Sequence, residues 1–170
     1  MKKSWILLVD LDGTLWDSDD ISSLKPPFRK VGDYAIEDSQ GIVVKAYSEM
    51  VELLKWAREN GALVAVVSWN IEEVALEALE KMGLLELVDY YAIEFHPRKD
   101  LMALKLVSRI AKNGYLDAVK CVVYIDDVEA FLSQVSQALE GVCTIRAWRD
   151  FHDKRMLMSK VSDCLSKCSV

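Results

Sequence analysis

The chain has 170 residues, of which 52% are hydrophobic, and a formal net charge of −6 at pH 7. This length and apolar content suffice for one sizeable core, so we expect a single domain over residues 1–170. Acidic and basic residues are spread along the chain without a basic run, which argues against nucleic acid and against an anionic membrane surface as the main partner.

The first residues superficially resemble the start of a signal peptide, because two lysines precede an apolar run. The run from Trp5 to Val9 is too short for that role and ends at Asp10, so we expect a buried first strand instead. No later segment approaches the roughly 20 apolar residues that span a bilayer. We therefore expect a soluble, cytoplasmic protein that is a monomer or a homodimer.

Short apolar, β-branched runs then alternate with longer segments of helical period. The predicted strands cover residues 4–10, 62–68, 90–95, 121–127 and 142–147, and the predicted helices cover 43–60, 71–83, 99–114, 128–141 and the end of the chain. This alternation predicts an α/β fold, a three-layer Rossmann-like sandwich with a central parallel five-stranded sheet, helices on both faces and no large cap domain.

Loop signals agree with these elements. A glycine falls where each of four predicted helices ends, at Gly61, Gly83, Gly114 and Gly141. Asn70 with Glu73 resembles a capping box at the start of the second helix. Residues 17–40 contain acids and a proline pair but no sustained period, so we expect an irregular loop that forms a minimal flap over the end of the first strand.

The four cysteines do not form CxxC pairs and have no suitably spaced histidines, which argues against a zinc site. Cys121 and Cys143 lie in predicted core strands. Cys164 and Cys168 lie one helical turn apart near the end of the chain, which disfavours a bond between them. We expect all four cysteines to be reduced and assign them no chemistry.

Polar residues follow the predicted strands at their carboxyl ends, which is where open parallel sheets bind ligands. The first strand leads into Asp10 and Asp12, the second ends at Ser68, the segment after the third contains Lys99, and the fourth ends in Asp126 and Asp127. Four carboxylates on one rim repel one another by about 1 kcal/mol per pair at contact distance in water. A hard divalent cation would offset this, and oxygen ligands without histidine or cysteine favour Mg²⁺.

The sequence DLDGTL (residues 10–15) resembles the DxDxT signature of the haloacid dehalogenase superfamily of phosphoryl-transfer enzymes. Ser68, Lys99 and the pair Asp126–Asp127 are similar to its second, third and fourth motifs, in order. A closer resemblance, up to about Arg146, is to the capless magnesium-dependent phosphatase family, which also shows DLDxTLW followed by PPF. The chain departs from that family at Gly13, Trp69 and Val128.

The resemblance implies a role for each matched residue. Asp10 would attack the phosphoryl group and form an aspartyl-phosphate, and Asp12 would act as general acid and then general base. Ser68 would donate to a phosphoryl oxygen, Lys99 would neutralise charge, and Trp69 would border the substrate. Mg²⁺ would be bound by the Asp10 carboxylate, the backbone carbonyl of Asp12, Asp126 and Asp127.

Several residues keep plain structural interpretations. The Asp126–Asp127 pair could cap a helix, and Lys105 is a rival to Lys99. The aromatic residues Trp16, Trp69 and Phe28 fit either the core or a substrate pocket, and the acidic sequence DSDD (residues 17–20) fits a solvated loop.

The predicted function is a magnesium-dependent phosphatase for a phosphorylated metabolite, phosphosugar or phosphoprotein. Alternatives are a phosphotransferase of the same superfamily and a non-enzymatic phospho-acceptor or binding module. A receiver-type signalling domain is disfavoured because its phosphoacceptor follows the third strand, where this chain has Glu94, Phe95 and His96.

Overall fold

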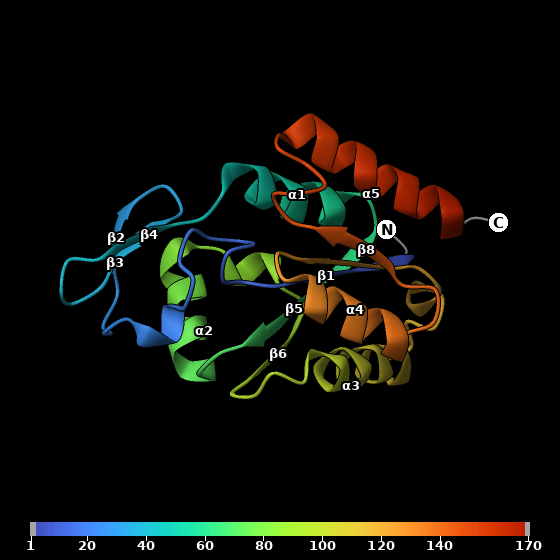
Figure 1. Cartoon of the computed structure of the whole chain (residues 1–170), viewed down its shortest axis with the longest axis horizontal. Helices are drawn as coiled ribbons and strands as arrows, with labels where there is room; N and C mark the ends of the chain where they lie inside the picture. Colours follow the sequence, from blue (N-terminus) through green and yellow to red (C-terminus); the bar gives the residue numbers. More distant parts are fainter. Residues whose placement is uncertain (1–2, 169–170) are drawn as a thin grey trace.

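Strand β1 (Trp5–Val9) lies at the centre of a parallel sheet in the computed structural model, which describes residues 3–168 (Figure 1). The strand order is β6-β5-β1-β7-β8. The other four strands are β5 (Ala62–Trp69), β6 (Tyr90–Glu94), β7 (Val122–Asp126) and β8 (Cys143–Arg146). The chain therefore extends the sheet to one side of β1 and then returns to extend it on the other, which is the topology that opens a crevice at the carboxyl ends of the central strands.

Helices cover both faces of this sheet, so the expected three-layer α/β sandwich is confirmed. One face carries α1 (Ser48–Glu59), α2 (Glu72–Met82) and α5 (Lys154–Cys168), and the other carries α3 (Lys99–Lys112) and α4 (Glu129–Ala138). Strand β1 shows why the sheet is buried on both sides, because Leu7 and Val9 belong to one core cluster and Ile6 and Leu8 to the other. Within residues 3–168, no helix combines the length and apolar character needed to cross a membrane.

A second, antiparallel sheet corrects the expectation for residues 17–60. Strands β2 (Arg29–Gly32), β3 (Ala35–Glu37) and β4 (Val43–Lys45) form this sheet, which we call the flap sheet. The helix predicted from residue 43 begins only at Ser48, because Val43 and Val44 pair with β3 as strand residues. The segment predicted to be irregular thus partly forms strands. The sequence pattern does not indicate β2, because this strand is short, exposed along its length and without alternating apolar residues.

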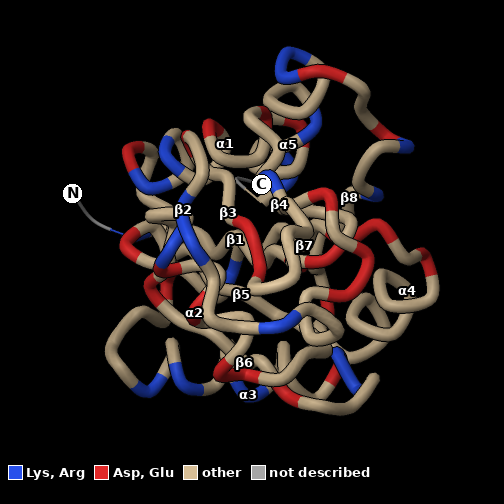
Figure 2. The backbone as a smooth tube through the Cα atoms, turned by 90° about the vertical axis from the view of Figure 1, so that its left-hand side faces the viewer, with Lys and Arg blue, Asp and Glu red and all other residues tan. Residues whose placement is uncertain are grey.

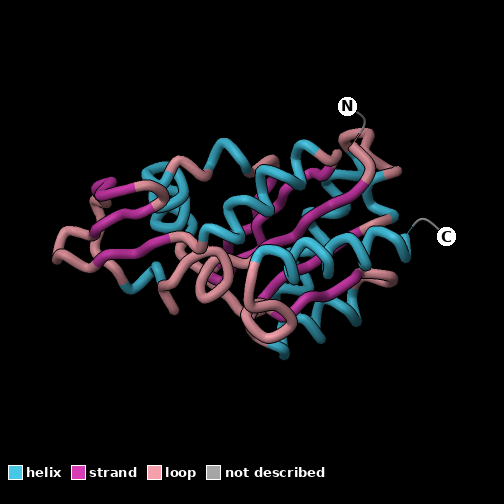
Figure 3. Tube along the Cα trace, turned by 90° about the horizontal axis from the view of Figure 1, so that it is seen from above, coloured by secondary structure: helices cyan, strands magenta, loops and turns pink. Residues whose placement is uncertain are grey.

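The flap sheet lies at the end of the molecule opposite the start of β1 and the last turn of α5 (Figures 1 and 3). It is attached to α2, where the backbone N–H of Phe28 donates to Glu77 at 2.7 Å. The buried Asp38 fixes the loop between β3 and β4 by accepting the backbone N–H groups of Lys25, Gln40 and Ile42. The part of the chain that the structure describes also contains three short 3₁₀ helices: η1 (Ile21–Ser23), η2 (Leu85–Leu87) and η3 (Ala118–Lys120).

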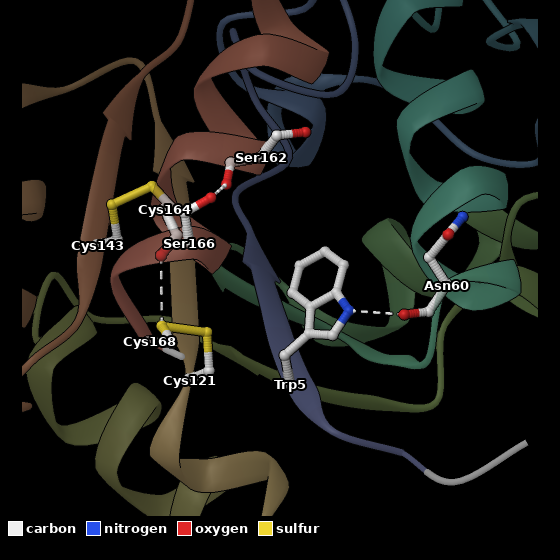
Figure 4. Close-up of a disulfide and its surroundings, with 8 residues drawn as sticks. All are labelled: Trp5, Asn60, Cys121, Cys143, Ser162, Cys164, Ser166 and Cys168. Carbon is white, nitrogen blue, oxygen red and sulfur yellow. Dashed lines mark hydrogen bonds between the residues drawn. A yellow bond between two sulfur atoms is a disulfide. The ribbon is translucent and has the colours of Figure 1, made fainter. Parts of the chain in front are cut away.

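The expectation of reduced cysteines is wrong. Disulfides join Cys121 to Cys168 and Cys143 to Cys164, with Cα atoms 5.4 and 5.7 Å apart, an ordinary spacing for such bonds (Figure 4). The helical turn between Cys164 and Cys168 does prevent a bond between these two. The same turn places Cys164 and Cys168 on one side of α5, facing the beginnings of β7 and β8. This pairing follows from the packing of α5 against the sheet, which the spacing of the cysteines in the sequence does not show.

Removing the disulfides should lower the free energy of unfolding without disturbing the opposite end of the sheet. The sequence separations of 47 and 21 residues correspond to about 4 and about 3 kcal/mol in a chain-entropy treatment, and less than their sum together because the loops are nested. Urea unfolding of the Cys121→Ser/Cys168→Ser and Cys143→Ser/Cys164→Ser variants, compared with the oxidised chain, measures this. If the unmodified chain unfolds at the same urea concentration with and without reductant, the disulfides do not form.

Candidate active site

Three charged side chains from separate elements meet at the carboxyl end of the sheet. Asp10 follows β1, Asp126 ends β7 and Lys99 begins α3. The Lys99 ammonium donates to Asp10 and to Asp126 at 2.6 Å each. All three residues are buried, since Lys99 is 2% exposed, Asp10 4% and Asp126 0%. Figure 2 looks onto this end of the molecule and shows acidic segments beside the labels of β1 and β7.

Asp127 completes a group of three carboxylates. Oxygen atoms of Asp10, Asp126 and Asp127 lie within 4.8 Å of one another, close enough to hold one metal ion. The hydroxyl of Thr14 accepts the backbone N–H of Asp127 at 3.0 Å and lies 3.2 Å from the Asp127 carboxylate and 3.3 Å from that of Asp10. Thr14 therefore ties the loop after β1 to the loop after β7.

Buried partners orient Asp126. The phenol of Tyr124 donates to the same carboxylate oxygen as Lys99, and the backbone N–H of Val128 donates to the other oxygen at 2.8 Å. Burial, together with the charge of Asp126, raises the pKa of Tyr124 well above its ordinary value, so this phenol keeps its proton as a donor. The helix-cap interpretation of Asp126 thus covers only one of its contacts.

The electrostatics of the site call for a further cation. Burial raises the pKa of Asp10 to about 8, and the charges of Asp126 and Asp12 add to this while Lys99 opposes it. Burial and the charge of Asp126 also raise the pKa of Asp127. For Lys99, burial lowers the pKa, but Asp10 and Asp126 outweigh it and hold the pKa above its ordinary value. One ammonium faces three carboxylates, and this all-oxygen donor set fits a hard divalent ion such as Mg²⁺.

Asp12 is held by three donors. Its Oδ1 accepts from the indole N–H of Trp16 at 2.7 Å and from the backbone N–H of Ile21 at 3.0 Å, and its Oδ2 accepts from Asn70 at 2.8 Å. Burial nevertheless raises its pKa, while these donors act in the opposite direction. Its carboxylate is fixed in orientation and lies outside the three-carboxylate group, so the expected metal contact through its backbone carbonyl stays a prediction.

The capping box expected at Asn70 and Glu73 does not form, because the side chain of Asn70 is used elsewhere. Asn70 is 1% exposed and donates to Asp12 and to the hydroxyl of Ser68, both at 2.8 Å, while it accepts from Ser22 at 2.6 Å. Ser22 in turn accepts the backbone N–H of Ile71, the residue at the N-cap of α2. No sequence signal indicates this role, since Asn before a helix ordinarily indicates a cap.

The two candidate lysines differ in position. Lys99 is in the site, whereas the side chain of Lys105 is 62% exposed and pairs with Glu94 at 2.9 Å. His96 also pairs with Glu94, at 2.6 Å. Lys105 and His96 therefore belong to a separate surface cluster.

A cavity of about 200 Å³ opens beside these groups. It is lined by Asp10, Asp12, Gly13, Asp19, Trp69, Lys99, Asp127, Val128 and Phe131. Ser68 is not part of this lining among the described residues, and Trp16 and Phe28 belong to the core. Sequence reasoning missed Asp19, which it assigned to a solvated loop, and Phe131, which follows Val128 at a helical spacing that equally fits the core.

Comparisons with known proteins bear on the fold. No protein-family model matches the chain, and neither does any curated protein. Among solved structures, a haloacid dehalogenase superfamily hydrolase from Ehrlichia chaffeensis is similar with a TM-score of 0.62 and 14% identity, covering 97% of this chain and 99% of that one. A phospho-aspartyl intermediate analogue of phosphoserine phosphatase gives 0.52 and 17%, covering 98% and 99%.

A third similar structure is the N-terminal part of a Bacteroides fragilis protein, which contains a phosphatase domain and is complexed with Mg, with a TM-score of 0.61 and 18% identity. The match covers 96% of this chain but only 40% of that one. The chain has the fold of the haloacid dehalogenase superfamily hydrolases, so the resemblance carried by DLDGTL is confirmed at the level of the fold.

Replacing Gly13 by alanine should weaken metal binding more than it weakens the fold. Gly13 has φ +67°, and an added Cβ would lie 2.7 Å from Oδ2 of Asp127, whose carboxylate would have to rotate away. Gly83 has φ +74° with nothing within 4 Å, so Gly83→Ala carries the same backbone strain, of about 1 to 2 kcal/mol, without that contact. We expect similar loss of stability in both variants and a lower Mg²⁺ affinity, measured calorimetrically, only in Gly13→Ala.

Mg²⁺ affinity should rise with pH up to about 8 and then level off. Since burial raises the pKa of Asp10 to about 8, this carboxyl retains a proton at pH 6 that the metal must displace, whereas about one pH unit above that pKa most of the carboxyls have already lost it. Calorimetric titration at pH 6 and pH 9, in buffers of different ionisation enthalpy, should detect proton release only at pH 6. Equal affinity and no proton release at both pH values would contradict this assignment, and Asp10→Asn should reduce the dependence.

Proposed function

We propose that this chain is a Mg²⁺-dependent phosphatase that hydrolyses phosphomonoesters through an aspartyl-phosphate on Asp10. The observation that carries the proposal is the buried arrangement of Asp10, Asp126 and Lys99, with the carboxylate of Asp127 beside it. An anionic nucleophile can approach an anionic phosphoryl group only where positive charge offsets their repulsion. The site provides that charge in Lys99 and an oxygen-rich position for a divalent ion.

Asp10, Asp126 and Asp127 would hold the metal through their carboxylates, and Asp12 through its backbone carbonyl. When bound, Mg²⁺ would supply charge that stabilises the transferring phosphoryl group. Support comes from the neighbours in fold, of which the Bacteroides fragilis phosphatase-domain structure and a 3-deoxy-D-manno-octulosonate 8-phosphate phosphatase from Moraxella catarrhalis contain Mg. The proposal extends that property to this chain on the strength of its own donor set.

Asp10 is the proposed nucleophile because it lines the cavity and is held by Lys99, whose ammonium favours the ionised carboxylate. Asp12 lines the same cavity, and its raised pKa suits a group that first donates a proton to the leaving oxygen and then accepts one from water. Ser68, oriented by Asn70, is the proposed donor to a phosphoryl oxygen once substrate is bound. The phospho-aspartyl analogue of phosphoserine phosphatase, a neighbour in fold, is consistent with this chemistry.

The disulfides affect the proposed location. Disulfides persist in oxidising compartments and are rare in the cytosol, except in hyperthermophiles, whose intracellular proteins are often disulfide-rich. The cytoplasmic location that we propose therefore applies to a cell with a disulfide-rich cytoplasm. Alkylation of free thiols directly in lysed native cells, followed by mass spectrometry, tests whether the disulfides form in the cell. Four alkylated cysteines in the chain would exclude the disulfide-rich cytoplasm.

Purified protein with Mg²⁺ should hydrolyse phosphomonoesters, EDTA should abolish turnover, and Asp10→Asn should lower kcat by at least about 10³-fold because the amide keeps the shape but lacks the nucleophilic oxygen. Steady-state release of phosphate measures this. Asp33→Asn, an exposed change of the same kind in the flap sheet turn, is the control that should retain full activity.

Asp12→Asn separates the two acids. It should slow an alkyl phosphate more than an aryl phosphate in the first step, since only the alkyl leaving group depends strongly on protonation. Near-normal turnover by Asp10→Asn, or equal losses for both esters in Asp12→Asn, would contradict the assigned roles.

A further inference from the structure

The two edges of the parallel sheet differ in how they end. At the β8 edge the chain occupies its own backbone groups, because the N–H of Arg146 donates to the Asp150 carboxylate at 2.7 Å and its carbonyl accepts from the N–H groups of Arg149 and Asp150. At the other edge, β6 pairs with β5 alone among the described strands (Figure 1). An edge without such a covering can accept a further strand.

The backbone groups of Tyr91 and Ile93 point toward this open edge. The N–H of Asn70 donates to the carbonyl of Glu94 at 3.2 Å, so Glu94 and the residues two and four positions before it bond to β5. Within residues 3–168, no turn, loop or side chain bonds to the backbone of Tyr91 or Ile93. The strand also lacks the lysine, proline or bulge that commonly protects an edge, and Tyr91 is 37% exposed.

The charges beside β6 match one another under a two-fold rotation. The guanidinium of Arg109 lies over the ring of Tyr90, 5.4 Å from its centroid, whereas Glu94 is at the other end of the strand. In an antiparallel pair of β6 strands with the axis at Ala92, Tyr90 lies directly opposite Glu94 of the second copy. Each Arg109 then faces a carboxylate of the second copy. Lys105, which pairs with Glu94 at 2.9 Å within the chain, lies beside the same carboxylate.

Helix α3 supplies further contact area. The pairing of two five-residue strands alone buries less surface than a stable dimer needs. The helix lies along β6, where Asn113 donates to the hydroxyl of Tyr90 at 3.0 Å, and its outer face has a hollow of about 560 Å³ lined in part by Leu101 and Leu104. These leucines are 40% and 38% exposed. Because paired strands lie about 4.8 Å apart, α3 of the second copy would run beside this hollow and cover part of its apolar surface.

We propose that β6 is a dimerisation edge at which two copies of this chain pair antiparallel, about a two-fold axis at Ala92, and join their parallel sheets into one. Tyr91 of each copy exchanges both backbone hydrogen bonds with Ile93 of the other, and Arg109 of each copy binds Glu94 of the other. The inference does not depend on the proposed phosphatase function. It chooses the homodimer from the two states, monomer and homodimer, that the sequence leaves open.

Sedimentation equilibrium of the oxidised chain over a concentration series tests this. The wild type should show a monomer–dimer equilibrium, and amide exchange at Tyr91 and Ile93 should slow as the dimer forms. Tyr91→Pro removes an N–H that bonds to nothing within the described chain. Circular dichroism should therefore show an unchanged fold, while the Kd of the dimer should rise by about tenfold or more. The control Tyr91→Val keeps the N–H and should still dimerise.

A charge reversal and its compensation test the register. Glu94→Arg puts a cation beside Lys105 and Arg109 of the second copy, and should raise the Kd by about tenfold or more. Adding Arg109→Glu should restore the dimer, because the new carboxylate faces the new guanidinium across the interface. Within one chain these two positions lie at opposite ends of β6, so the restoration requires a second copy. The control Glu129→Arg reverses an exposed glutamate that pairs with Arg146, and should leave the Kd unchanged.

A wild-type chain that sediments as a monomer at every concentration overturns the inference, and this includes the case in which the edge binds a strand of a different protein. A dimer that is unaffected by both Tyr91→Pro and Glu94→Arg also overturns it, because the interface then lies elsewhere. If Glu94→Arg weakens the dimer and Arg109→Glu does not restore it, the antiparallel pairing about Ala92 is wrong.

Discussion

The buried ammonium of Lys99 is the interaction on which the rest of the site depends. It bridges Asp10 and Asp126 at 2.6 Å each, and all three side chains are almost fully excluded from water. Two carboxylates at the ends of neighbouring strands would otherwise repel each other in a poorly hydrated space. Because β1 and β7 pair in parallel, their carboxyl ends lie side by side. Lys99 begins α3 and bonds to a carboxylate at each of these ends, so it also holds the start of that helix against the sheet. The proposed chemistry and the local packing thus depend on the same ion pairs.

A chain of hydrogen bonds connects Asp12 and Ser68 to η1, the short turn that precedes the flap sheet in the chain. Ser22 in η1 contacts Asn70, which contacts both Asp12 and Ser68, while the backbone of Ile21 contacts Asp12 directly. The segment that begins at residue 17 therefore takes part in orienting the proposed general acid. Since η1 is a single short turn, its position depends on these polar contacts and on the burial of Ile21 rather than on intrinsic helix stability.

Much of the fold follows from the sequence, because strands that are apolar throughout and helices with a 3.6-residue period leave few arrangements other than a covered parallel sheet. The carboxyl ends of such strands share one edge, so the meeting of Asp10, Lys99 and Asp126 could also be anticipated. The role of Asn70 could not, because an asparagine before a helix can either cap that helix or donate to a neighbouring loop. Only the position of Asp12, after the adjacent strand, decides between these two roles. The flap strands have only three or four residues each, which is too short to show a period.

The disulfides escaped prediction for a related reason, since the pairing of Cys121 and Cys143 with α5 is a property of tertiary packing. Their arrangement also has a consequence for chain cleavage. Because Cys121–Cys168 encloses Cys143–Cys164, a protease that cuts one peptide bond between residues 122 and 167 releases no fragment from the oxidised protein. Asp126 and Asp127 lie inside this closed segment, so a nicked molecule still carries every proposed metal ligand within one covalently connected body.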